Sequence, residues 1–510
     1  MQFVRVSSLI LVLAGSLNWS SAAHADGEPA AIAALLQGGS TIELAGRSVE
    51  TGTLTPFYAA RDYQPVWTTE RRNELTAALA DAPSQGLDPG AFTVPQADAA
   101  ATEILLSDAF MRYAVALAHG LVTMDDVYHS WGMPQPSLDP AAVLESALDQ
   151  GVAATLAALP PQDEGYASLR QAYLRYRDYT QHAAWVPLNL KLPLKLGATG
   201  ADVVKLRHRL AAEGFIPPGD SPVFGSALAA AVSRFQVARG LPPDGAVGLA
   251  TLTALNVTPG ARLRMIRLNL ERRRAMPREE PSTRIVVNVP DATVTLYQPE
   301  QPPLTMRAVV GDPKHPTPVL GATMNALLLN PPWIVPRSIA AKEILPHARS
   351  DPDYLADNDY VLEGGQLVQR PGPKNALGKI KFELPNRFDV YLHDTPAKAL
   401  FARPRRALSH GCIRVEDPRT LAERLMADNS KWTMDAIDAA VATGKTQRVM
   451  LPHPIPVSIV YWTAYVDGDG TVEFRNDIYG RDQRLDDALM ARDIGEQLRP
   501  SPPPAATVSN

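Results

Sequence analysis

The spacing of apolar residues changes at Ser282, and this change divides the chain into parts that must fold differently. Before it, Leu, Ala and Tyr recur every three or four residues, which predicts helices. After it, residues 285–289 alternate between apolar and polar, and a turn and a second such run follow, which predicts a β-hairpin. We therefore expect a multidomain α+β chain, with a helical scaffold at 26–185 and a β-rich domain at 282–485 that also contains helical insertions.

The two ends of the chain predict export and a disordered tail. Arg5 precedes the apolar run Leu9–Leu17, and Ala23-His24-Ala25 is a small-x-small cleavage site, so residues 1–25 read as a signal peptide. The apolar run is far shorter than the roughly 20 residues that span a bilayer. We expect an exported, periplasmic protein of the cell envelope. Residues 500–510, rich in Pro and Ala, predict a disordered tail.

Residues 190–258 predict a small unit of three helices. Gly197-x-x-Gly200 leads into an apolar stripe at helical spacing, a second helix ends in Phe235-Gln236, and Asp244-Gly245 marks a turn before a third helix. An Arg-rich linker helix follows within 259–281. Its arginines indicate either a basic patch or the solvated face of a connecting helix, and the solvated face is favoured. A net charge of -5 gives no footprint for nucleic acid, so we expect no such partner.

Cys412 is the only cysteine of the chain, so it has no partner for an internal disulfide. It lies in Ser409-His410-Gly411-Cys412. Three interpretations are open: a buried small apolar residue, a zinc ligand with His393 and His410, or a nucleophile. The flanking His-Gly pair and the second histidine, His393, favour the nucleophile, while the absence of any closely spaced ligand pair disfavours zinc.

Alternation along 388–393 places Tyr391 and His393 on one face of a strand, and the following loop is long enough to return Cys412 beside them. An imidazole next to a thiol can hold a thiolate–imidazolium pair and lower the thiol pKa. Gly411 lets the backbone approach closely and leaves amide groups free to face an oxyanion. These residues therefore predict acyl transfer through a thioester.

His393 followed by Ser409-His410-Gly411-Cys412-Ile413-Arg414 resembles the signature of the L,D-transpeptidase (YkuD-type) catalytic domain. Residues 196–258 resemble the three-helix peptidoglycan-binding module, although such modules can lose their ligand. With the helical N-terminal region, the chain resembles the large YcbB-type subfamily. Further agreement lies in short motifs across the β-rich domain: Val310-Gly311, Thr317-Pro318, Asn330-Pro331-Pro332-Trp333, Val335-Pro336, Asn375-Ala376-Leu377-Gly378 and Tyr391-Leu392-His393-Asp394-Thr395.

The resemblance implies roles for individual residues. Cys412 is the nucleophile, His393 the general base, and the carbonyl of Asp394 orients the imidazole. His410 and the amides of Gly411 and Cys412 shape the oxyanion site. We assign substrate binding to five residues: Arg414, Ser409, Tyr391, Asp394 and Trp333. For Arg414 a structural salt bridge is the open alternative. An insertion at about 336–375 resembles a capping subdomain over the active site.

The resemblance also implies the reaction. Cys412 attacks the amide after the third residue of a peptidoglycan tetrapeptide stem and releases D-alanine, and the amine of a neighbouring stem takes the acyl group in a 3→3 cross-link. Donor and acceptor stems are the expected partners, with cell-wall synthesis proteins besides them. No metal or organic cofactor is needed, and carbapenems should acylate the thiol. Alternatives are an L,D-carboxypeptidase, protein-to-peptidoglycan anchoring, and a non-catalytic cell-wall-binding protein.

Overall fold

The computed structural model describes residues 28–134, 137–182 and 185–497. Within this range the chain forms two compact units, one made of 28–67 and 94–108 and the other of 68–93 and 109–497. The expected signal peptide and the tail at 500–510 lie outside the described residues. No described helix combines the length and the apolar character needed to cross a membrane.

The smaller unit contains α1 (Glu28–Leu36), the hairpin β1 (Thr41–Leu44) and β2 (Arg47–Glu50), α2 (Leu54–Ala59) and the first half of α4 (Ala99–His119). Its core is built around aromatic rings, and Tyr58 and Trp67 are buried. Their polar atoms converge on Ser107, whose Oγ lies 2.7 Å from the Tyr58 hydroxyl and accepts the Trp67 indole N–H at 2.8 Å. These hydrogen bonds satisfy the polar atoms that the two aromatic side chains bury.

The larger unit begins with helices, as their spacing predicts. They are α3 (Thr69–Ala80), the 3-10 turns η1 (Ala82–Gln85) and η2 (Pro89–Phe92), α5 (Met124–Val127), α6 (Pro140–Gln150), α7 (Val152–Ala158) and α8 (Glu164–His182). The apolar spacing over 141–159 would suit one continuous helix, but the chain breaks at Gly151, where φ is 96°. Glycine adopts this left-handed backbone without the Cβ penalty, which allows the turn between α6 and α7.

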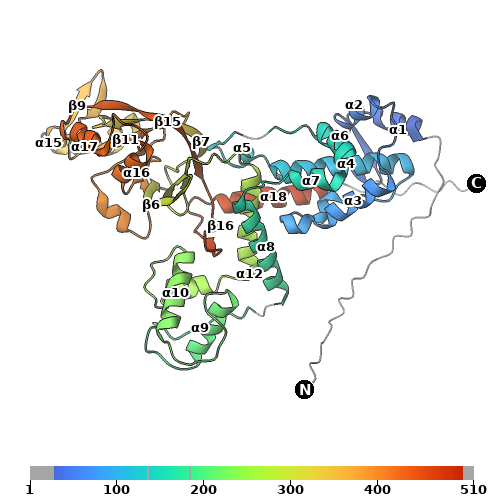
Figure 1. Ribbon diagram of the computed structural model, residues 1–510, viewed down its shortest axis with the longest axis horizontal. Helices are drawn as coiled ribbons and strands as arrows, with labels where there is room; N and C mark the ends of the chain where they lie inside the picture. Colours follow the sequence, from blue (N-terminus) through green and yellow to red (C-terminus); the bar gives the residue numbers. More distant parts are fainter. Residues whose placement is uncertain (1–27, 135–136, 183–184, 498–510) are drawn as a thin grey trace, which may run out of the picture. The chain divides into compact units, whose positions relative to one another are not determined.

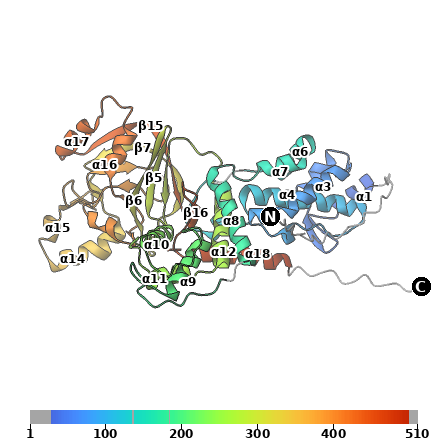
Figure 2. The same ribbon diagram turned by 60° about the horizontal axis from the view of Figure 1, so that its bottom comes forward.

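Helix α8 packs along α12 (Pro259–Arg274), as Figures 1 and 2 show, and both contact the hairpin of β16 (Ala464–Val466) and β17 (Val472–Phe474). Their shared core includes Tyr176, Ile266 and Phe474. The scaffold boundary expected at 185 therefore does not separate two cores, because residues from both sides of it pack together. Helix α18 (Arg481–Gln497) also contacts α12.

The Arg-rich helix α12 corrects the sequence interpretation. We expected a solvated face, but its last three arginines are buried. Arg272 pairs with Asp482 at 2.6 Å, Arg273 with Asp163 at 3.0 Å and Arg274 with Glu271 at 2.8 Å. Each buried guanidinium thus has a carboxylate, as burial of a charge demands. Two of these carboxylates lie far away in the sequence, so spacing within the helix could not reveal them.

The three-helix unit is formed by α9 (Ala201–Ala212), α10 (Ser226–Ala238) and α11 (Leu249–Leu255) around its own apolar core. Gln236 is buried within it. Its side-chain amide donates to Asp244 at 2.7 Å and to Thr251 at 3.0 Å, and its oxygen accepts the amide of Gly245 at 2.9 Å. The Phe-Gln and Asp-Gly motifs therefore hold the unit together by tying α10 to the turn before α11.

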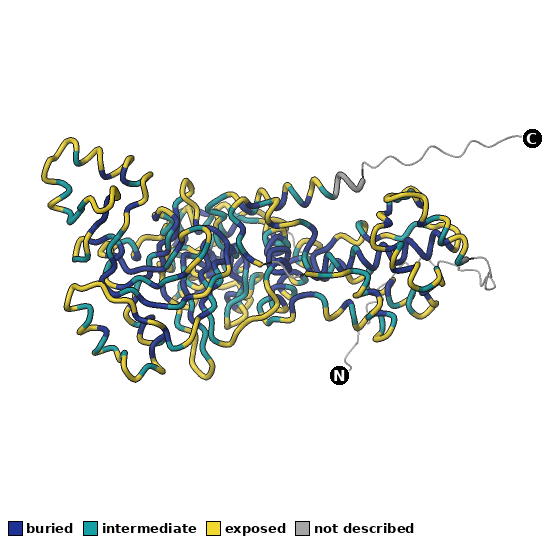
Figure 3. The backbone as a smooth tube through the Cα atoms, turned by 90° about the horizontal axis from the view of Figure 1, so that it is seen from above, coloured by how far each residue is buried: buried dark blue, intermediate teal, exposed yellow. Residues whose placement is uncertain are grey.

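The β-rich domain is one large sheet in which β11 pairs with both β12 and β7, so that the path of strands closes on itself. The expected hairpin is β4 paired antiparallel with β5. Figure 3 shows buried backbone running through the interior and exposed residues along the loops. The strands on the path are β3 (Trp131–Gly132), β4 (Arg284–Asn288), β5 (Thr293–Gln298), β6 (Gln301–Gly311), β7 (Val319–Leu329), β11 (Ile380–Glu383), β12 (Leu392–His393), β14 (Ile413–Val415) and β15 (Gln447–Val460), with β13 (Ala407–Ser409) beside β6.

Helices and a second small sheet are inserted between these strands. The segment after β8 (Trp333–Ile334) forms α13 (Arg337–Ile339), the π-helical turn η3 (Ala340–Ile344), α14 (Leu345–Ser350), α15 (Tyr354–Asp357), β9 (Tyr360–Glu363) and β10 (Gln366–Gln369). Strands β8, β10 and β9 pair, and the segment has a core of its own. We call residues 333–369 the cap. Later insertions are η4 (Lys398–Ala402), α16 (Pro418–Leu425) and α17 (Met434–Ala442).

Candidate active site

The two residues expected to carry the chemistry end up on neighbouring parallel strands. His393 closes β12, and Cys412 immediately precedes β14. The register pairs Leu392 with Ile413 and His393 with Arg414. Since side chains alternate along a strand, Cys412, Arg414 and His393 lie on the same face of the sheet. The loop between the strands therefore returns Cys412 to the strand next to that of His393.

His393 is held in one tautomer by the backbone. Its Nδ1 lies 2.5 Å from the carbonyl oxygen of Asp394, and a carbonyl only accepts, so Nδ1 carries the hydrogen and Nε2 has the free lone pair. The ring is buried, with 4% of the residue exposed. Burial, and next the charge of Arg414, lower the pKa of His393 to about 3. The imidazole is therefore neutral at rest and available as a base.

Cys412 is half-buried and its thiol points to the carbonyl oxygen of Asp389 at 3.9 Å. Burial raises the pKa of the thiol above its ordinary value, while hydrogen bonding from Tyr391 and the charges of Lys381 and Arg414 oppose this rise. We expected a thiolate–imidazolium pair with a lowered thiol pKa. The structure gives the opposite direction for both groups, because burial disfavours both charged forms.

The strand expected over 388–393 is shorter than predicted. Only Leu392 and His393 pair as β12. Asp389 has a φ of 53°, in the left-handed region that non-glycine residues seldom adopt, although Asp tolerates it better than most. This turn directs the Asp389 carbonyl at the thiol. The alternation nonetheless puts Tyr391 beside His393, with ring centroids 5.6 Å apart.

The turn before Cys412 is fixed by Ser409, which is buried. The Ser409 hydroxyl donates to the carbonyl of Cys412 at 2.6 Å and accepts the amide of Gly411 at 3.2 Å. Ser409 therefore shapes the turn and the Gly411 amide is already engaged, while substrate binding by Ser409 stays a prediction. The amide of Cys412 has no hydrogen-bond partner among the residues that the structure describes, so it is the better oxyanion donor.

The same turn is braced from the opposite side by Thr317 and Gly311. The Thr317 hydroxyl donates to the carbonyl of Gly411 at 2.7 Å and accepts the amide of Gly311 at 2.9 Å. The Tyr479 hydroxyl in turn donates to the carbonyl of Gly311 at 2.5 Å. Gly411 itself has a φ of 111°, so a side chain there would be strained. A network of backbone contacts therefore sets the position of the nucleophile.

His410 connects this turn to the cap. Its Nε2 lies 2.6 Å from the carboxylate of Glu343 in η3, and its ring is tilted against that of His315 at 4.7 Å between centroids. The side chain of His410 is thus directed to the cap. Zinc ligation by Cys412, His393 and His410 has no support, and no group of three or more potential metal ligands occurs in the described part of the chain.

Two cations flank Cys412, and the sequence revealed only one of them. Arg414 makes no salt bridge within the described residues, and its buried Nε has no hydrogen-bond partner there. The structural ion pair considered for it is therefore not formed. Lys381 on β11 faces His393 in the register, and its ammonium lies 3.8 Å from the centroid of the Tyr391 ring. No local motif surrounds Lys381, and only the pairing of β11 with β12 brings it here.

The remaining expected substrate contacts lie elsewhere. The Asp394 carboxylate is buried, accepts the amide of Lys379 at 2.8 Å and pairs with Lys398 at 2.8 Å, so only its backbone carbonyl serves the site. Trp333 belongs to β8 and packs on the core of the cap. The structure therefore brings Cys412, His393, Tyr391 and Arg414 together, but neither the Asp394 side chain nor Trp333.

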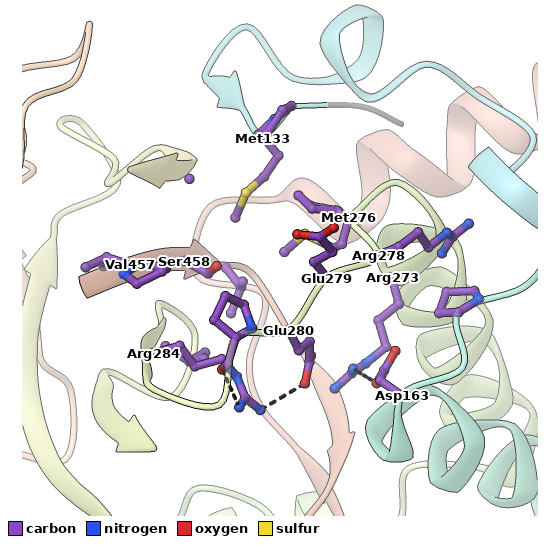
Figure 4. A pocket seen from close by; sticks show the side chains of 18 of the residues that line it. Met133, Asp163, Arg273, Met276, Arg278, Glu279, Glu280, Arg284, Val457 and Ser458 are labelled. Carbon is purple, nitrogen blue, oxygen red and sulfur yellow. Dashed lines mark hydrogen bonds and ion pairs between the residues drawn. The ribbon is translucent and has the colours of Figure 1, made fainter. Parts of the chain in front are cut away.

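A cavity of about 260 Å³ lies away from this site (Figure 4). It is lined by residues of the segment after α12 and of strands β7 and β15, with Met133 at one edge. In Figure 4, Arg273 points to Asp163 and Arg284 to Glu280, and dashed lines mark these pairs. Two of its arginines are thus paired with carboxylates, and none of the candidate catalytic residues lines it.

Comparison with known families identifies three parts of the chain. Residues 282–453 match the L,D-transpeptidase catalytic domain, residues 199–255 a putative peptidoglycan-binding domain and residues 52–172 a scaffold domain. The chain therefore contains an L,D-transpeptidase catalytic domain together with a peptidoglycan-binding domain and a helical scaffold. These matches confirm the predicted L,D-transpeptidase catalytic domain and the predicted order of a helical scaffold, a three-helix module and a β-rich domain.

A curated relative, a putative L,D-transpeptidase of Haemophilus influenzae, is 30% identical over 247 residues, which are 44% of this chain and 50% of the relative. The chain thus spans half the length of that relative. An L,D-transpeptidase from Mycobacterium smegmatis is 18% identical over 35% of this chain and 58% of its own, with a TM-score of 0.20. L,D-transpeptidase 1 of Mycobacterium tuberculosis is 14% identical over 35% and 61%, with a TM-score of 0.18.

Proposed function

We propose that the protein is an exported peptidoglycan L,D-transpeptidase of the large YcbB-type subfamily, which forms 3→3 cross-links between stem peptides. The observation that carries this is the arrangement of Cys412 and His393 on adjacent parallel strands, with Nδ1 of the histidine fixed by the Asp394 carbonyl. Such a pair is suited to acyl transfer, because the thiol is the nucleophile and Nε2 is placed to exchange protons.

The reaction starts from a neutral pair. Nε2 of His393 takes the thiol proton of Cys412 as Sγ attacks the carbonyl carbon of the third residue in a tetrapeptide stem. The amide of Cys412 donates a hydrogen bond to the developing oxyanion, an interaction that contributes roughly 2.7–4 kcal/mol when well placed. The carbon–nitrogen bond then breaks, His393 returns its proton to the leaving D-alanine nitrogen, and a thioester remains on Cys412.

In the second half the acceptor amine attacks the thioester carbonyl. His393 accepts a proton from this amine and returns it to Cys412 as the carbon–sulfur bond breaks, so the enzyme is restored. The low pKa of His393 favours both proton deliveries, because its imidazolium is a strong acid. Water in place of the amine would give an L,D-carboxypeptidase, and a protein lysine would give protein anchoring.

The acceptor is identified by products. The mature protein is incubated with purified disaccharide-tetrapeptide and the mixture is analysed by mass spectrometry. Dimers lacking one D-alanine support transpeptidation, tripeptide alone indicates hydrolysis, and retained activity in Cys412→Ala would refute the mechanism. His393→Ala should abolish the dimers, whereas His453→Ala, an exposed histidine on β15, serves as the matched control and should leave them unchanged.

Three further parts of the proposal have their own tests. A carbapenem should form one covalent adduct on the peptide that carries Cys412, since acylation needs the same attack. Absence of any adduct would favour a non-catalytic cell-wall-binding protein. Binding by residues 190–258 is tested by sedimentation of the full chain with purified peptidoglycan sacculi. Cleavage after Ala25, read by mass spectrometry of the periplasmic fraction, tests export.

A further inference from the structure

Lys381, His393 and Arg414 form a row across three strands. Lys381 on β11 is opposite His393 on β12, and His393 is opposite Arg414 on β14. Residues in direct register share one face of the sheet. Cys412 and Tyr391 belong to this face as well, so a lysine and an arginine lie on opposite sides of the Cys412–His393 pair.

Neither cation has a carboxylate of its own. Within the described residues no salt bridge includes Lys381 or Arg414. The acid on the same strand face as Lys381, Glu383, is paired with Arg448 at 2.6 Å. The carboxylate of Asp394 is likewise held by Lys398. Burial of a cation is costly without an anion, so two partly buried cations beside the thiol, neither of them in a salt bridge, point to an external anion.

The thiolate of Cys412 does not serve as the anionic partner of Lys381 and Arg414 in the resting protein. Both cations attract the Cys412 thiolate, but burial raises the thiol pKa, so the thiolate is scarce near neutral pH. A ligand with a carboxylate near the attacked bond would relieve the excess positive charge. In the proposed reaction the residue that leaves carries a free C-terminal carboxylate, about one residue length (~3.8 Å) from the attacked carbonyl.

We propose that Lys381 is a specificity-determining residue which, together with Arg414, binds the C-terminal carboxylate of the residue that leaves the acyl donor. This inference rests on the proposed function for the identity of the donor. It accounts for the choice of the terminal peptide bond, because the residue that leaves at an internal bond has its carboxyl group in the next amide and offers no free C-terminal carboxylate. Arg414 offers a planar fork for the carboxylate, and Lys381 contributes a point charge held against the Tyr391 ring.

The unique cysteine allows a test that needs no substrate. Iodoacetate and iodoacetamide both alkylate the thiolate of Cys412, so the ratio of their rates cancels the thiolate fraction and reports the attraction for a carboxylate. Lys381→Met should lower this ratio roughly three- to tenfold, the effect of one charge in a partly screened site. Lys381→Arg should keep it, and so should Lys445→Met, which removes an exposed lysine of the same domain.

A second measurement uses the donor itself. For a donor with a free C-terminal carboxylate, Lys381→Met should have a higher KM than the unsubstituted protein. A donor amidated at its C-terminus should be processed equally by these two proteins. An unchanged alkylation ratio in Lys381→Met would overturn the anion site, even if the protein cross-links stems. A lowered ratio in a protein that acts on no stem peptide would keep the anion site and refute the proposed function instead.

Discussion

Gly311 offers a direct test of how the backbone positions the nucleophile. A Cβ at this position would lie 2.1 Å from the carbonyl oxygen of His315, 2.7 Å from the amide nitrogen of Thr317 and 3.1 Å from Cα of Gly411. All three are backbone atoms, so no flexible side chain can move aside. In Gly311→Ala the loop at 315–317 must therefore move away from the end of β6, and Thr317, which holds the carbonyl of Gly411, moves with it.

The expected loss has two components. Overpacking against backbone costs about 1–3 kcal/mol, which lowers Tm by roughly 2–4 °C per kcal/mol in a domain of this size. A displaced Cys412 amide also loses its alignment with the oxyanion, and loss of one such donor slows acyl transfer about 10²- to 10³-fold. We therefore expect Gly311→Ala to melt several degrees lower and to be acylated by a carbapenem at least tenfold more slowly.

Gly468 provides the matched control in the same domain. A Cβ there meets no atom within 4 Å, and its φ lies outside the left-handed region. Differential scanning calorimetry and single-turnover acylation, followed by mass spectrometry, are carried out on both alanine variants. If Gly311→Ala matches Gly468→Ala in both Tm and acylation rate, the close approach of the two backbones does not position the thiol and the reasoning fails.

Three other predictions concern the surroundings of the thiol. Thr317→Val leaves the carbonyl of Gly411 without its donor, so we expect a loss of about 1–3 kcal/mol in urea unfolding and slower acylation; an unchanged midpoint would contradict it. The pKa of His393 falls from 6.5 to about 3 on folding, so between these pH values the unfolded chain binds a proton that the folded chain does not. The free energy of unfolding should therefore fall progressively from about pH 6.5 to pH 3, by roughly 4–5 kcal/mol at the lower end. In urea unfolding at a series of pH values, His393→Asn should show a shallower acid dependence. Glu343→Gln weakens a partly exposed pair with His410 worth up to about 1 kcal/mol, so amide exchange in residues 337–350 should accelerate up to about fivefold, while equal exchange would show that this pair does not hold the cap.

The sequence predicts those parts of the molecule whose signals are local. Alternation predicts the hairpin of β4 and β5, and apolar spacing predicts the three-helix unit. The motifs on either side of one loop predict that Cys412 and His393 lie on neighbouring strands. Local patterns fail where the partner is distant. The burial of Arg272 depends on Asp482, and the place of Lys381 depends on a strand pairing that no spacing reveals. The positions of such residues therefore depend on the strand and helix pairing of the whole fold, which the spacing of apolar residues does not predict.

The protonation states of Cys412 and His393 belong to the same class of non-local properties. A histidine near a cysteine in sequence suggests an ion pair, but burial and the charges of Lys381 and Arg414 make the imidazolium unfavourable. The same charges favour the thiolate. The site is thus arranged so that a proton taken from the thiol is held only briefly and passes readily to the leaving amine. A bound carboxylate would partly neutralise Lys381 and Arg414 and make the imidazolium less costly, so the donor itself would promote the proton transfer that activates Cys412.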